Sequence, residues 1–104
     1  MQRPRYPDVV IFTFSGEIIE WRGPAPFYFV AVPEDIADGI SALAPTVTYG
    51  WGVIPATVRI GATEATTSLF PKNGGYLVPL KAALRNPRKL MTGDYVVITV
   101  HIGN

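Results

Sequence analysis

Short apolar runs separated by turn residues make up most of the chain. Runs rich in β-branched and aromatic residues cover 9–14 and 17–22 and flank Ser15-Gly16, a spacing that predicts a β-hairpin. After a turn at 23–26, the run 27–32 is apolar at every position. Such a run predicts a central strand that is buried on both faces.

A helix is predicted directly after this strand. Pro33 has the φ that the first helical position requires, and it lacks only an N–H that the helix does not use there. Ile36, Ile40 and Leu43 then recur at the spacing of one helical face. Pro45 predicts the end of this helix.

The second half of the chain repeats this plan. The two junctions of strand, proline and helix lie 46 residues apart, which indicates an internal duplication. The repeated elements are a hairpin over 53–60 and 65–70 with its turn at 61–64, a turn at 71–75, a strand over 76–78, and a helix that begins at Pro79 and ends before Pro87.

The chain ends in a regularly alternating strand over 94–102. Its apolar face carries Val96, Ile98, Val100 and Ile102, and its other face carries Tyr95, Thr99 and His101. Six or seven short strands with two short helices predict an all-β fold, and we expect a small closed or nearly closed β-barrel of two pseudo-repeats. The 104 residues are expected to form a single domain.

Composition excludes several kinds of chemistry. The chain has no cysteine and one histidine, His101, which excludes thiolate metal sites, multi-histidine metal sites and cysteine nucleophiles. No serine stands in a Gly-x-Ser-x-Gly motif, the motif of a serine nucleophile. From these observations together we expect no catalytic residue, no metal and no cofactor. The longest apolar run, 27–32, is too short to span a bilayer, and the N-terminus has no secretory pattern. We therefore expect a cytoplasmic protein that does not bind membranes.

The charges are unevenly distributed, although the net charge is only +1. Residues 1–52 hold three basic and six acidic side chains, whereas residues 53–104 hold six basic and two acidic ones. No acidic residue occurs between Ala65 and Gly93. This asymmetry is typical either of a face that binds anions or of a solvated basic surface.

Basic and aromatic residues form the candidate binding site. Indole rings stack on bases and cations, and guanidinium groups pair with carboxylate or phosphate. We expect a non-enzymatic module that binds a small anionic ligand or a peptide where these residues converge; the alternative is a core role for both tryptophans, with basic side chains around it. The candidate ligand-binding residues are Trp21, Arg22, Tyr49, Trp51, Arg59, Lys72, Tyr76, Lys81 and Arg85.

Five sequence blocks carry a resemblance to a known family. They are residues 20–27 (EWRGPAPF), 48–52 (TYGWG), 67–72 (TSLFPK), 75–81 (GYLVPLK) and 93–96 (GDYV). Together, over about residues 14–100, they resemble a bacterial family of small domains of unknown function that occur alone or fused to YdeI/OmpD-associated (bacteriocin-protection) proteins. The resemblance implies a double-split β-barrel, as in AbrB/MazE-like DNA-binding domains. Ala65 stands where many relatives carry Trp.

Two other functions remain open. The resemblance to AbrB-like domains implies binding to nucleic acid, against which the near-zero net charge counts, because phosphate contacts need a broad basic face. The other alternative is a structural domain that mediates protein interaction as a homodimer, which predicts an exposed apolar edge.

Overall fold

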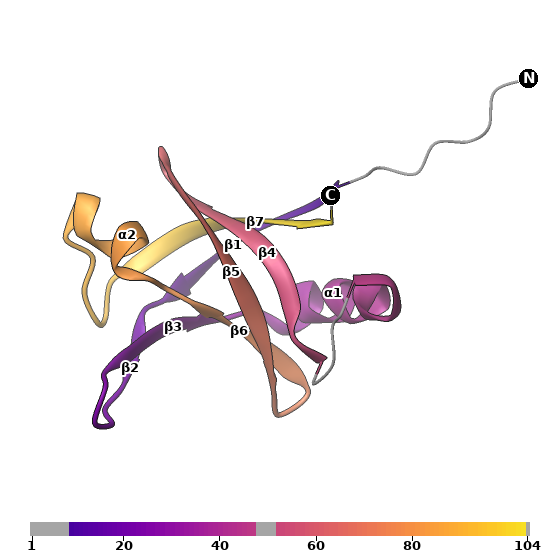
Figure 1. Cartoon of the computed structure of the whole chain (residues 1–104), viewed down its shortest axis with the longest axis horizontal. Coiled ribbons are helices and arrows are strands. Elements are labelled where there is room, and N and C mark those ends of the chain that lie inside the picture. Colours follow the sequence, from indigo (N-terminus) through magenta and orange to yellow (C-terminus); the bar gives the residue numbers. More distant parts are fainter. Residues whose placement is uncertain (1–8, 48–51, 104) are drawn as a thin grey trace, which may run out of the picture.

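The computed structural model describes residues 9–47 and 52–103. Within them, seven antiparallel strands form one curled sheet, a half-barrel, in the order β1-β7-β4-β5-β6-β3-β2 (Figure 1). The strands are β1 (Val9–Glu17), β2 (Ile19–Trp21), β3 (Phe27–Ala31), β4 (Ile54–Ile60), β5 (Thr63–Lys72), β6 (Gly75–Pro79) and β7 (Tyr95–Gly103), and the helical elements are α1 (Glu34–Val47), α2 (Ala82–Arg85) and the 3-10 turn η2 (Asn86–Arg88). The prediction of an all-β fold with two short helices is confirmed.

One edge segment changes its pairing partner at a single residue. β1 pairs with β7 over its whole length, whereas β2 pairs with β3, and only Ile18 lies between them. The Ile18 N–H donates to the Asp94 carbonyl at 2.8 Å, and the Ile18 carbonyl accepts from the Gly93 N–H at 2.9 Å. The Ile18 side chain is fully buried. The two ends of the sheet order are therefore consecutive in the chain, and this forces the sheet to curl around the core.

The predicted hairpin around Ser15-Gly16 is wrong. β1 continues straight through both residues, which lie opposite Val97 and Val96 of β7. Gly16 instead meets a packing requirement, because a Cβ atom at this position would lie 2.4 Å from Cγ1 of Val30 in β3. Glycine here allows two strands to approach closely and does not mark a turn.

The core fills the inside of the half-barrel. The predicted alternation of β7 is confirmed, and β4 follows the same pattern. The helices α1 and α2 lie at opposite ends of the curled sheet, where Ile40 of α1 and Leu84 of α2 are fully buried (Figure 1). The inward residues of the two central strands are Ile54, Ala56, Val58 and Ile60 of β4 and Val96, Ile98, Val100 and Ile102 of β7.

Helix α1 begins where it was predicted but extends further. Pro33 precedes Glu34, the first helical residue, and the Pro33 carbonyl accepts the Ala37 N–H at 2.8 Å. The helix runs to Val47, two residues beyond the end predicted at Pro45. Pro45 lacks one N–H donor and its ring crowds the carbonyl four residues earlier, but only two helical residues follow it, so it lies where the helix ends and not in its body.

The β4–β5 hairpin is confirmed, with a tighter turn than predicted. Ile60 lies opposite Thr63, so the turn consists of Gly61 and Ala62. The next turn, between β5 and β6, consists of Asn73 and Gly74, whose φ values are 50° and 81°. Two positive φ values are what a two-residue type I′ hairpin turn requires.

The predicted helix start at Pro79 is wrong. Pro79 is the last residue of β6 and lies opposite Phe29 in β3, and α2 begins only at Ala82. The next residue, Leu80, donates its N–H to the Tyr28 carbonyl at 2.9 Å. Because hydrogen-bonded pairs alternate along an antiparallel ladder, Pro79 occupies a position where no N–H donor is needed.

The predicted duplication corresponds to a repeated order of elements. Three strands and a helix, β1–β2–β3–α1, are followed by β4–β5–β6–α2. The equivalent strands β3 and β6 pair with each other, and β2 and β5 flank them. The repeats differ in the pairing of their first strand. In the first repeat β1 pairs with β7 and not with β2, whereas in the second repeat β4 pairs with β5 as a hairpin.

Replacing Gly16 with alanine tests the close approach of β1 and β3. Gly16→Ala is expected to lower the free energy of unfolding by about 1–3 kcal/mol, because the Val30 side chain is fully buried and its β-branched χ1 is restricted, so it moves aside only at a cost. Chemical denaturation measures this loss. The matched control is Gly75→Ala, whose Cβ would meet only the Lys72 carbonyl, at 3.7 Å, and which is expected to change stability by less than about 0.5 kcal/mol.

The double variant with Val30→Ala identifies the contact responsible. Its loss is expected to be smaller than the sum of the two single losses, because the shortened side chain at position 30 vacates the space that the new methyl group needs. Wild-type stability of Gly16→Ala, or strict additivity in the double variant, would contradict the packing role of Gly16.

Candidate functional site

A hollow lies on the outer face of the sheet, beside β4, β7 and η2. Its cavity volume is about 710 Å³. Arg59 and Gly61 contribute from the β4 side, Arg88 from η2, and Thr99 and His101 from β7. We call this cavity the arginine hollow, because two guanidinium groups meet in it.

Both guanidinium groups contact the same glycine. The Arg59 Nε donates to the Gly61 carbonyl at 2.9 Å. Nη2 of Arg88 occupies the space beside Gly61, since a Cβ atom on this glycine would lie only 2.0 Å away from it. Among the described residues the only ion pair within 4 Å joins Arg22 and Glu20, so neither Arg59 nor Arg88 is held in one there, although Glu64 lies opposite Arg59 in the β4–β5 ladder. The hollow thus places two positive charges beside one glycine.

A left-handed residue lies beside each arginine of the hollow. Gly61 has a φ of 60° in the β4–β5 turn, and Arg59 lies two residues before it on the outer face of β4. Lys89, with a φ of 52°, ends η2, and its N–H donates to the Asn86 carbonyl at 3.1 Å. Arg88 is the last residue of η2, directly before this left-handed residue.

The rest of the hollow combines apolar surface with a few polar groups. Tyr95 and Val97 line it and are 75% and 59% exposed. Thr99 shares a hydroxyl–hydroxyl contact of 3.3 Å with Thr13 of β1, and His101 is half-buried. Guanidinium donors beside apolar side chains can hold a carboxylate or a phosphate that is attached to an apolar body.

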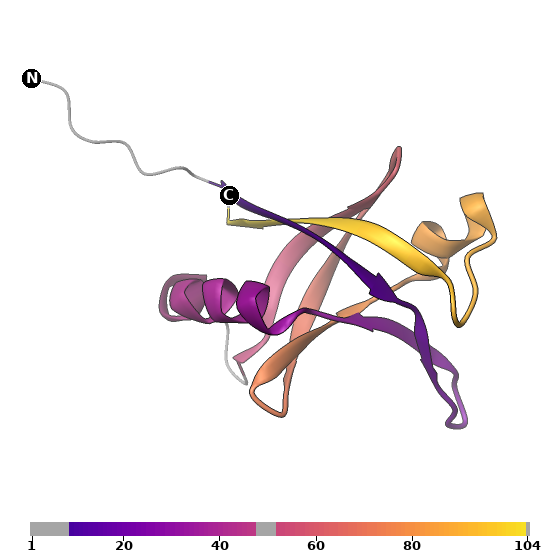
Figure 2. The same ribbon diagram turned by 180° about the vertical axis from the view of Figure 1, so that it is seen from behind.

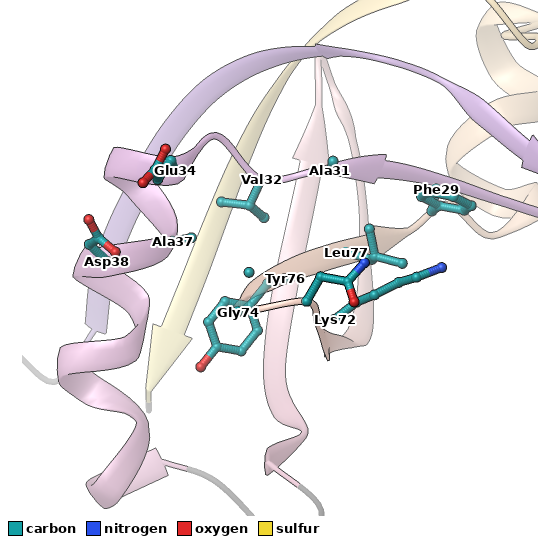
Figure 3. A pocket seen from close by; sticks show the side chains of 12 residues that line it. Phe29, Ala31, Val32, Glu34, Ala37, Asp38, Lys72, Gly74, Tyr76 and Leu77 are labelled. Atoms are coloured by element: carbon teal, nitrogen blue, oxygen red, sulfur yellow. The ribbon is translucent and has the colours of Figure 1, made fainter.

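A second cavity of about 720 Å³ lies between the start of α1 and the β5–β6 turn. Figure 3 shows Glu34 and Asp38 on the α1 side and Lys72 and Tyr76 on the β5–β6 side. Its other walls are mostly apolar, with Phe29 among them. Charges of both signs line this cavity, so it lacks the single-sign character of the arginine hollow.

The predicted binding residues are distributed over several parts of the surface. Arg59 lines the arginine hollow, whereas Lys72 and Tyr76 line the second cavity, where Tyr76 is largely buried. Tyr49 and Trp51 lie outside the described residues.

The remaining predicted residues lie on β2 and around α2. Trp21 is exposed on β2, and Arg22 pairs with Glu20 at 3.4 Å. The Lys81 ammonium donates to the Thr66 carbonyl. The Arg85 guanidinium lies 4.0 Å from the centre of the Tyr28 ring, and its Nε donates to the Leu80 carbonyl at 3.0 Å, so existing contacts engage this guanidinium.

Sequence reasoning missed Arg88 and His101 as residues of this hollow. Arg88 belongs to the stretch without acidic residues, and His101 belongs to the polar face of the last strand, so both signals were present. The proximity of His101 to Arg59 depends on the register of β7 against β4, in which Thr99 lies opposite Arg59. Ala65 packs against the core opposite Val58.

Two kinds of feature are absent from residues 9–47 and 52–103. In that part of the chain, no three His, Cys, Asp or Glu side chains are grouped so that they could hold a metal ion. None of the helices described there is long and apolar enough to cross a membrane.

Comparison with known proteins places the chain in a family. Neither the curated proteins nor the solved structures gave a significant match. One family, described as "Domain of unknown function (DUF1905)", matches residues 14–100 and thus spans nearly all seven strands. The expected resemblance to a family of small domains of unknown function is confirmed at this level, and the chain belongs to the DUF1905 family.

Proposed function

We propose that this domain is a non-enzymatic binding module that takes a small organic anion in the arginine hollow. The observation that carries the proposal is the meeting of Arg59 and Arg88 at Gly61, where no ion pair among the described residues holds either guanidinium group. Two like charges held close together repel each other, and a bound anion converts this repulsion into two attractive contacts.

The chemistry of the hollow favours a carboxylate or phosphate that is attached to an apolar group. Guanidinium groups form paired hydrogen bonds with these planar or tetrahedral anions. Tyr95 and Val97 offer exposed apolar surface beside the charges. The volume of about 710 Å³ falls in the range of sites that hold small molecules.

Removing either arginine tests this function. Arg59→Ala and Arg88→Ala are each expected to weaken binding of phenyl phosphate about ten- to hundredfold, because a charged hydrogen bond contributes about 1.5–3 kcal/mol. Isothermal titration calorimetry with phenyl phosphate, benzoate and inorganic phosphate provides the measurement. The matched control is Lys72→Ala, which removes an exposed cation from the second cavity and is expected to leave binding unchanged.

Three outcomes would contradict the proposal. The first is no binding of any of the three anions, and the second is binding that Lys72→Ala abolishes while both arginine variants retain it. The third is binding of a short DNA duplex alone, with an affinity that falls steeply with salt, which would favour the nucleic-acid alternative.

Gly61→Ala separates the geometry of the hollow from the charges. An alanine at this position displaces the Arg88 guanidinium and strains a positive φ, so we expect loss of phenyl phosphate binding together with a modest loss of stability. Gly74→Ala is the matched control, because it has a φ of 81° but nothing within 4 Å of its Cβ. It is expected to lose stability without losing binding; equal binding losses in both variants would contradict the role of Gly61.

A further inference from the structure

Strand β2 has an unpaired edge. It stands at the end of the sheet order, and its one partner in the sheet is β3. The Tyr28 carbonyl of β3 accepts the Leu80 N–H on the side of β6. Because the backbone groups of successive residues point to opposite sides of a strand, those of Phe27 and Phe29 point toward β2. The residue of β2 opposite Tyr28 is Glu20, whose backbone N–H and carbonyl therefore point to the free edge. Such groups form a template for another strand.

The outer surface beside this edge is aromatic. Trp21 is 56% exposed and Ile19 is 41% exposed, and both side chains lie on the same face of β2. Phe27 lies opposite Trp21 in the pairing of β2 with β3, and its ring stacks with the ring of Phe29 at 5.6 Å between their centres. The β2–β3 hairpin protrudes from the body at the end away from α1 (Figures 1 and 2). Exposed apolar surface on an accessible strand is typical of an interaction site.

The charges of Glu20 in β2 and of Arg22 directly after it are arranged for pairing with an identical segment. Glu20 and Arg22 flank Trp21 and form an ion pair of 3.4 Å within one chain, where the exposure of Arg22 makes this pair weak. If two copies of β2 run antiparallel about Trp21, Glu20 of each copy lies opposite Arg22 of the other. A two-fold axis then produces two cross-strand pairs of opposite charge.

We propose that this edge binds a second copy of the same chain through antiparallel pairing of the two β2 strands. In this register Glu20 and Arg22 occupy the hydrogen-bonded positions, with their backbone groups directed to the free edge. Trp21 occupies the non-hydrogen-bonded position, where facing residues come closest, so the two indoles pack against each other. An identical strand satisfies the charge pattern in both directions at once, which is what a symmetric dimer requires.

Charge reversal tests this register. Sedimentation equilibrium of the full chain is expected to show a monomer–dimer equilibrium. Glu20→Arg and Arg22→Glu are each expected to raise the dissociation constant about tenfold, because each places like charges opposite one another twice. The double variant Glu20→Arg/Arg22→Glu is expected to restore the wild-type constant. Asp38→Arg, a reversal of an exposed carboxylate on α1, is the matched control and is expected to have no effect.

The outcomes are decisive even if Glu20→Arg fails to fold, since Arg22 is 87% exposed and its reversal leaves the fold intact. A monomer at every concentration up to about 1 mM, where association is no stronger than about −4 kcal/mol, would overturn the proposal. So would a dimer that neither single reversal weakens, or one that the double reversal does not restore.

Discussion

The change of pairing partner at Ile18 determines the arrangement of the rest of the sheet. Its backbone completes the ladder with the segment before β7, and the next residue already pairs with β3. Because side chains alternate between the faces of a strand, a shift of one residue here would exchange inward and outward positions along β2. The buried Ile18 side chain fixes this register, and Gly16 lets β3 pass close to β1 at the same corner.

A sheet curled in this way uses its interior for packing. Val58 of β4 and Ile98 of β7 are fully buried there, and no charged or polar residue belongs to the core of the described chain. Binding chemistry is consequently left to the outer face and the edges. The arginine hollow uses the outer face of β4 and β7, and the proposed dimer contact uses the edge of β2, so the two can function independently.

Periodicity predicted the elements whose structure is determined locally. The alternation of β7, the β4–β5 hairpin and the start of α1 all follow from short-range patterns. The hairpin predicted at Ser15-Gly16 and the helix start predicted at Pro79 are wrong because both positions depend on neighbours distant in sequence. Position 16 requires glycine because Val30 packs directly against it. Pro79 is tolerated in β6 because its position opposite Phe29 needs no N–H donor. A glycine or proline signals a constraint, but the packed structure decides whether the constraint is a turn.

The same reasoning explains why the site was only partly predictable. Arg59 was identified from its residue type, whereas Arg88 belongs to the hollow through its contact with Gly61, a residue distant in sequence, and local patterns do not predict such a contact. Arg59 and Arg88 are both exposed, so solvent screens the repulsion between their charges. An anion gains most when its apolar part covers the exposed surface of Tyr95 and Val97, because excluding water strengthens each charged hydrogen bond. If the hollow binds anions as proposed, the apolar wall would therefore decide, more than the charge itself, which anions it distinguishes.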